Sequence, residues 1–358
     1  MQRISSSSFL QMKYIQTSIG LEWSCCLEDE LKEIQEFFRN YFTIETVSVN
    51  SDCDIYIRFY PYSKFDNRTF TSLDFQHVVI RNSSAEQFCF EGDTASKNSI
   101  EWIHCPSTKT ALLFYHEEKT IVAFITSSSH YQIVDLIRCL VINNEEYKGT
   151  MILHASGVVY NDSGIAFVGS KGAGKTTFSL DLAKQEGVYF FSGDKLFLRL
   201  QNDGIVMHPW PDYPHVGTGT IYADNTMLAG LIKKGYNISR CNPNSKILLN
   251  QYELCDIFNL TPYYKPVYLR KILLPRIENA ETTVERIFHM EEIFISNLEF
   301  SEENRFTQWT KYIIPLPKRK QLNRILRLRN KLVDIPFFSL RGNTHMTDSQ
   351  RAMILCSN

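Results

Sequence analysis

Apolar residues in the first part of the chain recur at the spacings of helices and strands. In Leu27–Phe38 they return every three or four positions, which predicts an amphipathic helix, and Tyr131–Tyr147 repeats the pattern. Residues 1–130 read as a mixed α+β region, for which we expect a recognition or scaffold role because catalytic residue types do not cluster there. Runs rich in β-branched and aromatic residues predict its strands at Asp54–Tyr60, His77–Ile80, Thr110–Tyr115 and Thr120–Thr126.

The pattern changes at Thr150. Met151–Tyr160 and Gly164–Val168 predict two strands joined by a turn, and a glycine-rich loop leads from the second strand into a helix over Lys175–Gln185. Strands that alternate with helices are typical of an α/β fold, so we interpret residues 131–358 as one α/β domain with a mixed sheet. Its remaining strands are expected at Val188–Phe191, Lys195–Leu200, Lys246–Leu249 and Lys271–Pro275.

Glycines mark where this second region must turn tightly. Of the 16 glycines, only Gly20 and Gly92 precede residue 149, whereas eight lie from Gly149 to Gly193. Glycine reaches backbone conformations that other residues avoid. The cluster therefore predicts tight turns or a close approach of the backbone to a ligand.

The charges balance, with 38 Lys and Arg against 39 Asp and Glu and a formal net charge of −1. This balance excludes a nucleic-acid binder that works by bulk positive charge. No stretch approaches the roughly 18 apolar residues of a transmembrane helix, and the N-terminal residues lack the apolar core of a signal peptide. The nine cysteines contain no C-x-x-C pair, which disfavours a structural zinc site and fits reduced thiols. We expect a cytoplasmic protein without a membrane partner.

One motif indicates a specific chemistry. Gly169–Thr176 matches the phosphate-binding pattern G-x-x-x-x-G-K-[ST] in full and lies between a predicted strand and a predicted helix. Its glycines let successive N–H groups converge on phosphate oxygens at a helix N-terminus. Lys175 is expected to neutralise the β- and γ-phosphates, and Thr176 to ligate Mg²⁺. The sequence thus predicts a site for ATP and Mg²⁺, with GTP left open as the nucleotide, formed by Gly169, Ser170, Lys171, Gly172, Ala173, Gly174, Lys175, Thr176 and Thr177.

Phosphoryl transfer also needs a carboxylate near the phosphates. Asp194 follows the first strand after the loop helix, and we expect that strand to lie beside the strand that precedes the loop, which returns the acid to the phosphates. The structural alternative is a turn aspartate that caps Ser192 and Gly193. His154, on the strand before the loop, is either a buried structural histidine or a group that contacts phosphate.

Three motifs together resemble a known family. They are L-H-A-S-G-V-V at Leu153–Val159, G-S-K-G-A-G-K-T-T at Gly169–Thr177 and F-S-G-D at Phe191–Asp194, and they are similar to the C-terminal domain of HPr kinase/phosphorylase. The likeness is greatest to stand-alone relatives of that domain in bacterial peptide-tailoring clusters, and phosphoenolpyruvate carboxykinase shares the fold. Residues 1–130 carry no resemblance. The match covers about Thr150–Leu200, with weaker echoes at Met207–Pro211, Leu273–Ile277 and Ser339–Leu340.

The resemblance implies an HPr-kinase-like P-loop fold and ATP-dependent phosphorylation of a serine hydroxyl. It implies that Lys175 binds the β- and γ-phosphates, and that Thr176 and Asp194 hold Mg²⁺. Asp194 would also be the general base, and His154 would stand near the transferred phosphate. The family has two consecutive acids where this chain has Gly193 and Asp194, which puts the metal coordination and the reverse phosphorylase reaction in question.

The acceptor follows less directly from the resemblance. The C-terminal signature of true HPr kinases is missing from this sequence, which disfavours HPr as the substrate. Related stand-alone enzymes phosphorylate a serine on a lasso-peptide precursor, or free serine. We favour a serine of a peptide or small protein, such as the precursor of a ribosomal natural product.

A basic segment near the end of the chain suggests where such an acceptor binds. Lys318–Leu332 carries seven Lys and Arg and no acid, and Leu322, Ile325, Leu326 and Leu332 are spaced to bury one face of a helix. The segment is either a solvated surface helix or a docking face for an acidic peptide leader.

Other readings stay open. The run from Met207 to Gly219 holds three prolines, and its histidines at 208 and 215 match no common metal-site spacing, so we expect an ordered loop that lines the substrate. The missing acid at Gly193 favours a nucleotide-binding regulatory or scaffold protein that transfers nothing. A nucleotidyltransferase or a small-molecule kinase, for example of free serine, is a third class. The relatives often form homo-oligomers, and the sequence leaves the oligomeric state of this chain open.

Overall fold

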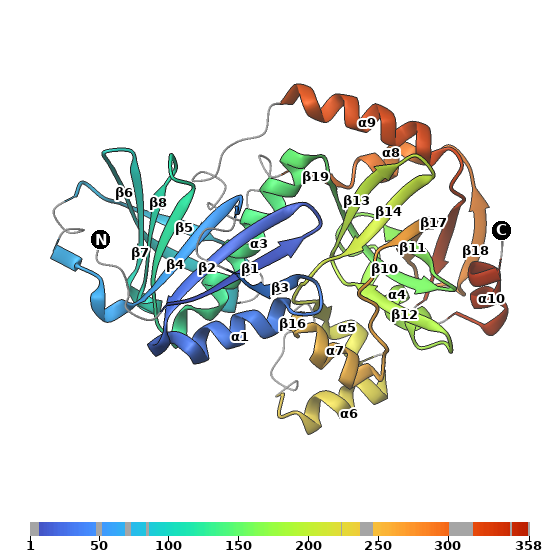
Figure 1. Ribbon diagram of the computed structural model, residues 1–358. Helices are drawn as coiled ribbons and strands as arrows, with labels where there is room; N and C mark the ends of the chain where they lie inside the picture. Colours follow the sequence, from blue (N-terminus) through green and yellow to red (C-terminus); the bar gives the residue numbers. More distant parts are fainter. Residues whose placement is uncertain are drawn as a thin grey trace. The chain divides into compact units, whose positions relative to one another are not determined.

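The computed structural model describes residues 7–47, 52–68, 73–83, 86–222, 224–236, 246–300, 318–343 and 346–356. It confirms a mixed α/β protein, and the described residues divide after Lys148 into two compact units. The sequence suggested a boundary after residue 130, but helix α3 (His130–Lys148) packs against α1 (Glu28–Phe38) within the first unit (Figure 1). None of the helices in these ranges has both the length and the apolar character needed to cross a membrane.

The first unit is built on one mixed sheet. Within the described residues it has nine strands in the order β3-β1-β2-β4-β9-β8-β7-β6-β5. β2, β4 and β9 are parallel at its centre, and the other neighbours pair antiparallel. The strands are β1 (Ser7–Tyr14), β2 (Thr17–Ser24), β3 (Thr43–Thr46), β4 (Ile55–Pro61), β5 (Gln76–Arg81), β6 (Phe90–Lys97), β7 (Ile100–Cys105), β8 (Thr110–Tyr115) and β9 (Thr120–Ile125).

The second unit contains the glycine-rich loop. Its main sheet runs β11-β10-β13-β14-β17-β20-β18, with β12 and β19 paired to β10 and β11 also paired to β17. A short separate ribbon of β15 (His215–Gly217) and β16 (Lys246–Leu248) stands apart from this sheet. The strands of the main sheet are β10 (Met151–Tyr160), β11 (Ser163–Val168), β12 (Val188–Ser192), β13 (Lys195–Gln201), β14 (Gly204–Pro209), β17 (Val267–Ile277), β18 (Thr283–Ile287), β19 (Leu298–Glu299) and β20 (Phe337–Gly342).

Helices cover this sheet, and the core lies on both of its faces. Alternate residues of β11 enter two different hydrophobic clusters. Ile165 and Phe167 belong to one cluster, and Ala166 and Val168 belong to the other. A strand buried on both faces explains the unbroken apolar run that the sequence shows before the loop. The helices are α4 (Lys175–Ala183), α5 (Thr218–Tyr222), α6 (Asn225–Lys233), α7 (Gln251–Phe258), α8 (Glu291–Ile295), α9 (Lys318–Leu332) and α10 (Asp348–Cys356).

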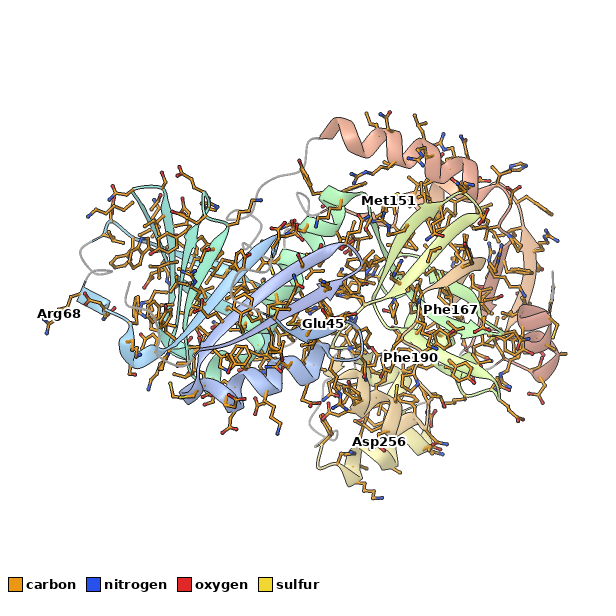
Figure 2. All side chains as sticks on the ribbon, in the orientation of Figure 1. Glu45, Arg68, Met151, Phe167, Phe190 and Asp256 are labelled. Atoms are coloured by element: carbon orange, nitrogen blue, oxygen red, sulfur yellow. The ribbon has the colours of Figure 1, made fainter. Side chains whose placement is uncertain are left out.

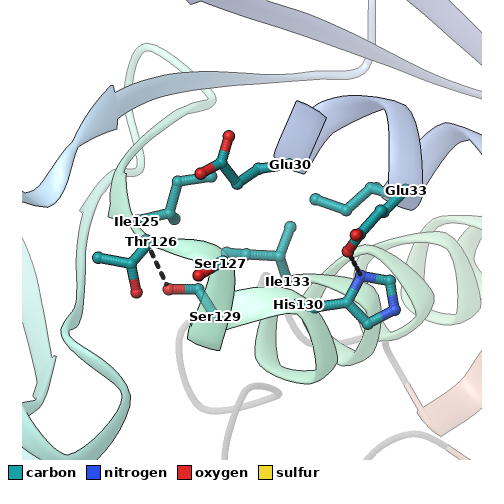
Figure 3. Close-up of a pocket in the computed structure, with 9 residues that line it drawn as sticks. Glu30, Glu33, Ile125, Thr126, Ser127, Ser129, His130 and Ile133 are labelled. Atoms are coloured by element: carbon teal, nitrogen blue, oxygen red, sulfur yellow. Dashed lines mark hydrogen bonds and ion pairs between the residues drawn. The ribbon is translucent and has the colours of Figure 1, made fainter. Parts of the chain in front are cut away.

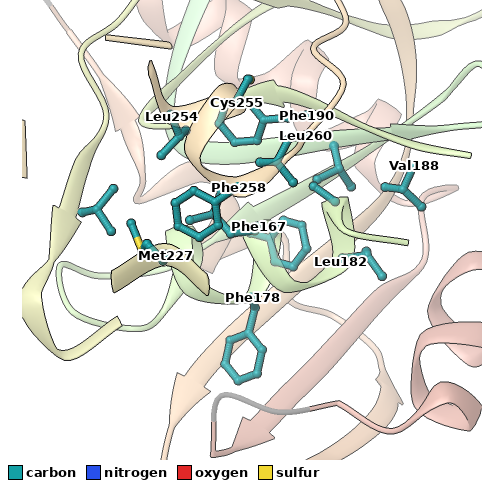
Figure 4. Close-up of a cluster of buried hydrophobic side chains, with 14 of the residues drawn as sticks. Phe167, Phe178, Leu182, Val188, Phe190, Met227, Leu254, Cys255, Phe258 and Leu260 are labelled. Carbon is teal, nitrogen blue, oxygen red and sulfur yellow. The ribbon is translucent and has the colours of Figure 1, made fainter. Parts of the chain in front are cut away.

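The cluster that includes Phe167 anchors the loop helix. Figure 4 shows Phe178 of α4 grouped with Phe167, Phe190 of β12 and Phe258 of α7, and all four side chains are buried. Figure 2 shows where Phe167 and Phe190 lie within the second unit. Removing an aromatic ring of this kind from a packed core costs roughly 3–5 kcal/mol. The start of α4 is therefore held on the sheet by a dense apolar contact.

One expectation about the sheet is wrong. The strand after the loop helix, β12, does not lie beside β11, because β10 stands between them and pairs with both. Along β10, residues 155–160 pair with β11 and residues 157–160 with β12, whereas residues 151–154 pair with β13. Asp194 lies between β12 and β13, at the point where the neighbour of β10 changes.

The basic helix α9 has the predicted bounds, and its expected buried face is confirmed in part. Leu332 and the partly buried Ile325 pack into the core as expected, together with Leu328, whereas Leu322 and Leu326 are 66% and 57% exposed, contrary to expectation. Residues four apart on a helix share a face. The pair Leu322 and Leu326 thus forms an apolar strip on the exposed side of α9. Helix α9 packs against α8 (Figure 1).

Candidate phosphate-binding site

The loop between β11 and α4 adopts a conformation that depends on glycine. Gly172 and Gly174 have φ angles of +85° and +101°, which side-chain-bearing residues rarely adopt. A Cβ at Gly174 would lie 2.7 Å from Cγ1 of Ile277 at the end of β17. β17 is parallel to β11, so the carboxyl ends of the two strands lie at the same edge of the sheet. Ile277, at the end of β17, therefore packs against the loop that follows β11.

Lys175, the first residue of α4, is folded back into the loop. Its Nζ donates hydrogen bonds to the carbonyl oxygens of Gly169 at 2.7 Å and Ser170 at 3.2 Å, and the residue is buried. Burial lowers the pKa of Lys175, and the charge of Lys246 adds to this, while Asp194 opposes it. The loop thus folds over the ammonium group. A phosphate that binds here would replace the two carbonyl oxygens as the hydrogen-bond acceptors of Lys175.

The two threonines after Lys175 differ in their contacts. The Thr177 hydroxyl forms a 2.9 Å hydrogen bond with the Thr220 hydroxyl on α5. Thr176 is half-buried in the first turn of α4, and its carbonyl accepts a hydrogen bond from Ser179. Ser170 and Lys171 are exposed. The predicted loop residues are thus contiguous around the start of α4, with the Thr177 side chain already tied to α5.

Strand register gathers a second group of polar side chains. Leu153 is paired with Leu196 of β13 and Leu298 of β19, and all three enter one core cluster. Because neighbouring residues of a strand point to opposite faces, His154 and Lys195 lie on the other face of the sheet.

That other face is the one against which α4 packs. Glu299 is paired with Ile152, two residues from His154, and so shares this face as well. Phe167 and Phe178, which join α4 to the sheet, belong to the cluster on this side. The register therefore places His154, Lys195 and Glu299 together on the side of the loop helix.

Asp194 completes this polar cluster. Its Oδ1 lies 3.4 Å from Nδ1 of His154, and its Oδ2 lies 3.6 Å from Nζ of Lys195. Partial loss of solvent alone raises the pKa of Asp194, but nearby positive charges, Lys195 foremost, outweigh it and hold the pKa far below its usual value. Asp194 is thus ionised, and with 42% of its side chain exposed it remains accessible to a ligand.

His154 sits between two carboxylates. Its Nδ1 is 3.4 Å from Oδ1 of Asp194 and 3.4 Å from Oε1 of Glu299. Burial lowers the pKa of His154 in spite of Asp194, and the charges of Lys175 and Lys195 lower it further. The imidazole is therefore neutral at neutral pH, with its Nδ1 facing both carboxylates.

The proline-rich segment after β14 packs over the cluster. A Cβ at Gly193 would lie 3.1 Å from Cγ of Pro214. Trp210, fully buried, stacks on Phe197 of β13 with ring centroids 4.3 Å apart. His215 lies close enough for its charge to act on Asp194. The segment therefore packs against the sheet and adjoins the acid, and its role in lining the substrate stays a prediction.

The sequence reasoning missed two members of this cluster. Lys195 adjoins Asp194 in the chain, so its position was a usable signal, and its raised pKa reflects the carboxylates of Glu299 and Asp194 acting against burial. Glu299 gave no signal, because a two-residue strand paired with β10 carries no pattern of its own. Within the described ranges, no group of three or more His, Cys, Asp or Glu is arranged to hold a metal ion without other ligands.

A pocket also lies in the first unit, at the start of α3 (Figure 3). Glu30 and Glu33 of α1 face Ser129 and His130 across it, and burial lowers the pKa of His130. The nine described residues that line it include neither Lys nor Arg. Phosphate ligands need cationic or N–H donors, so the loop of the second unit is the stronger candidate site.

Comparison with known proteins adds little to this geometry. No protein-family model matches the chain, and no curated protein matches it significantly. Among solved structures, the HPr(Ser) kinase/phosphatase from Coxiella burnetii is similar to 57% of this chain and 85% of that chain, at 11% identity and a TM-score of 0.26. The function proposed below rests on the residues of the site.

Proposed function

We propose that this chain is an ATP-dependent kinase that transfers the γ-phosphoryl group to a serine hydroxyl of a peptide or small protein. One observation carries the proposal. The lysine of a glycine-rich phosphate loop is folded into that loop, and the accessible carboxylate of Asp194 lies beside His154 and Lys195, on the sheet face against which the loop helix packs. Phosphoryl transfer needs this pair, one group for the phosphates and one for the acceptor proton.

The side chains present fit a nucleotide-bound Mg²⁺. This ion takes oxygen ligands, commonly one or two carboxylates and a hydroxyl, with phosphate and water completing the shell. The accessible Asp194 carboxylate and the Thr176 hydroxyl at the start of α4 are donors of this kind. When bound, the ion would neutralise charge on the β- and γ-phosphates.

The proposed reaction is an in-line displacement. The serine oxygen bonds to the γ-phosphorus, the bond from that phosphorus to the β–γ bridging oxygen breaks, and ADP leaves with the electron pair. The serine proton passes to a carboxylate oxygen of Asp194. The low pKa of Asp194 makes it a weak base that is fully ionised, which suits a loose transition state in which the acceptor needs orientation more than activation.

Helix α9 is the proposed docking face for an acidic acceptor or its leader. The exposed Leu322 and Leu326 form an apolar strip, and the exposed Arg327 adjoins it. Arg329 already pairs with Glu292, and Lys331 donates to the Asn202 carbonyl. A peptide with apolar and acidic residues in alternation matches this surface.

The test uses the full-length chain with Mg²⁺, γ-labelled ATP and serine peptides that carry an acidic leader. Asp194→Asn should keep ATP binding within a few-fold and lose transfer by at least ~100-fold, because the acceptor proton has no recipient. Asp203→Asn, at the exposed turn between β13 and β14, is the matched control and should transfer normally. Wild-type turnover in Asp194→Asn would remove the base from the mechanism.

The mass added to the acceptor decides among the other reaction classes. A phosphate indicates a kinase, and a nucleotidyl group indicates a nucleotidyltransferase. A product formed only with free serine would identify a small-molecule kinase. ATP binding without transfer or hydrolysis would favour the regulatory reading, which the lack of a second acid at Gly193 supports.

A further inference from the structure

Two carboxylates compete for one lysine beside the phosphate loop. Lys195 Nζ donates a hydrogen bond to Oε2 of Glu299, whereas it stays 3.6 Å from Oδ2 of Asp194, beyond hydrogen-bond distance. Lys195 is the most enclosed of the three, with 14% of its side chain exposed against 36% for Glu299 and 42% for Asp194. The lysine therefore leans toward Glu299, although Asp194 precedes it directly in the chain.

This preference leaves Asp194 in a longer ion pair with Lys195, at 3.6 Å, that lacks a hydrogen bond. Among the described residues, no side chain donates a hydrogen bond to the Asp194 carboxylate, although His154 and Lys195 both stand within 4 Å of it. The main-chain carbonyl of Asp194 accepts from the Ala155 N–H, so the backbone is fixed while the carboxylate makes only the longer contacts with His154 and Lys195. Nearby charge keeps the group ionised, and its lone pairs stay available.

Packing leaves little room for a nearer second carboxylate. A Cβ at Gly193 would lie 3.1 Å from Cγ of Pro214, so a side chain at that position requires the proline ring to shift slightly. Glu299 instead reaches the same lysine from β19, on the other side of β10. A glutamate with this much exposure adds little to stability through its ion pair, so a structural role alone gives a weak account of its position.

We propose that Glu299 is a positioning residue that draws Lys195 away from Asp194 and so keeps the Asp194 carboxylate free to take the acceptor proton. The proposal rests on the kinase function proposed above. Without Glu299, Lys195 would have a single carboxylate partner and would close the remaining gap to Asp194. The acid would then be occupied by a hydrogen-bonded ion pair, while the phosphate loop would be unchanged.

The first test is kinetic, on the full-length chain. Glu299→Gln should lower kcat about 10–100-fold and leave the KM for ATP within about threefold, because orienting partners of site residues have effects of this size. Glu299→Asp keeps the charge and should recover part of kcat. In a Lys195→Met background, Glu299→Gln should change kcat less than about twofold, because the two residues act as one unit. Glu117→Gln, at an exposed glutamate of the first unit, is the matched control.

The second test is structural and does not need activity. A crystal structure of Glu299→Gln should show Lys195 Nζ within hydrogen-bond distance of Asp194, closer than the present 3.6 Å. An unmoved lysine, a kcat equal to the wild type, or a full effect of Glu299→Gln in the Lys195→Met background each overturns the inference. If the wild type transfers no phosphoryl group, the proposed function has failed, and the crystal structure alone decides whether Glu299 holds the lysine.

Discussion

Arg351 binds Asp181 through three hydrogen bonds, from Nη2 to Oδ1 at 3.0 Å, from Nη2 to Oδ2 at 3.1 Å and from Nε to Oδ2 at 3.2 Å. Asp181 lies on α4 and Arg351 on α10, so the contact joins the last described helix to the helix that begins at the phosphate loop. Both side chains are largely buried, at 16% and 17% exposure. The loop helix is thus secured at its far end by a charged pair as well as by its apolar face.

We expect Arg351→Met to destabilise the second unit by about 1–3 kcal/mol, because it leaves the Asp181 carboxylate with an unmet, poorly solvated charge. Urea denaturation measures the effect. Asp348→Asn removes the other partner of the same guanidinium, at a carboxylate that is 97% exposed, and should shift the midpoint little. Equal losses in both variants would contradict the role given to Asp181.

Gly174→Ala should impair nucleotide binding and stability for two reasons. The φ of +101° disfavours alanine by roughly 1–2 kcal/mol, and the new Cβ meets Ile277. Trimming the partner in Gly174→Ala/Ile277→Ala should restore part of the loss, since it removes the collision and leaves only the backbone strain. Gly172 has a φ of +85°, but a Cβ there would meet no atom within 4 Å. The loss of stability in Gly172→Ala should therefore be closer to that of the double variant than to that of Gly174→Ala. Denaturation and ADP titration report both effects.

Lys175→Met should weaken ATP binding about 10–100-fold, because charge-assisted hydrogen bonds to phosphate are lost while the side-chain volume is kept. Lys171→Met removes the same charge from the same loop, but its side chain is exposed, and loops of this kind bind phosphate at such positions through backbone N–H groups. Calorimetric titration should therefore show a change of less than about threefold for Lys171→Met. Similar losses in both variants would mean that the loop attracts nucleotide only through its total charge.

Acid should destabilise the fold through His208 on β14. Burial, helped by Arg199, lowers the pKa of His208 to about 4, whereas an unfolded histidine titrates near 6.5. Between these values the unfolded chain binds a proton that the folded chain does not, so stability falls as the pH drops from about 6.5 to 4. At pH 5 the loss is on the order of 2 kcal/mol.

His208→Asn removes this proton and should flatten the decline in Tm between pH 7.5 and 5. His289→Asn is the control, because His289 is exposed and its φ of +60° suits asparagine. A decline that is the same in wild type and His208→Asn would place the acid sensitivity elsewhere in the chain.

Local patterns predicted part of the elements, and pairing between distant segments was beyond them. The bounds of Thr110–Tyr115, Met151–Tyr160 and Lys318–Leu332 agree with the structure, because periodicity and turn residues within each segment define them. Five strands of the first unit, β1, β2, β3, β6 and β7, were not predicted.

The candidate site likewise contains residues that local motifs predict and contacts that only strand pairing determines. The loop and Asp194 have signals in the chain next to them, and the identity of the residues around Lys175 follows from one motif. The separation of β12 from β11 by β10, and the approach of Glu299 to Lys195, depend on register among strands far apart in sequence. The exposed side of α9 was misjudged because helical spacing alone does not say which of two apolar strips meets the sheet.

The pairing of β19 with β10 has a consequence for synthesis of the protein. A growing chain that has reached Thr177 already carries the whole loop motif, whereas Glu299 is the last member of the polar cluster to be synthesised. Synthesis proceeds at roughly 5–20 residues per second. In the interval, Lys195 has Asp194 as its acidic neighbour from the cluster. The polar cluster of a nascent chain would then be complete only after β19 docks on β10.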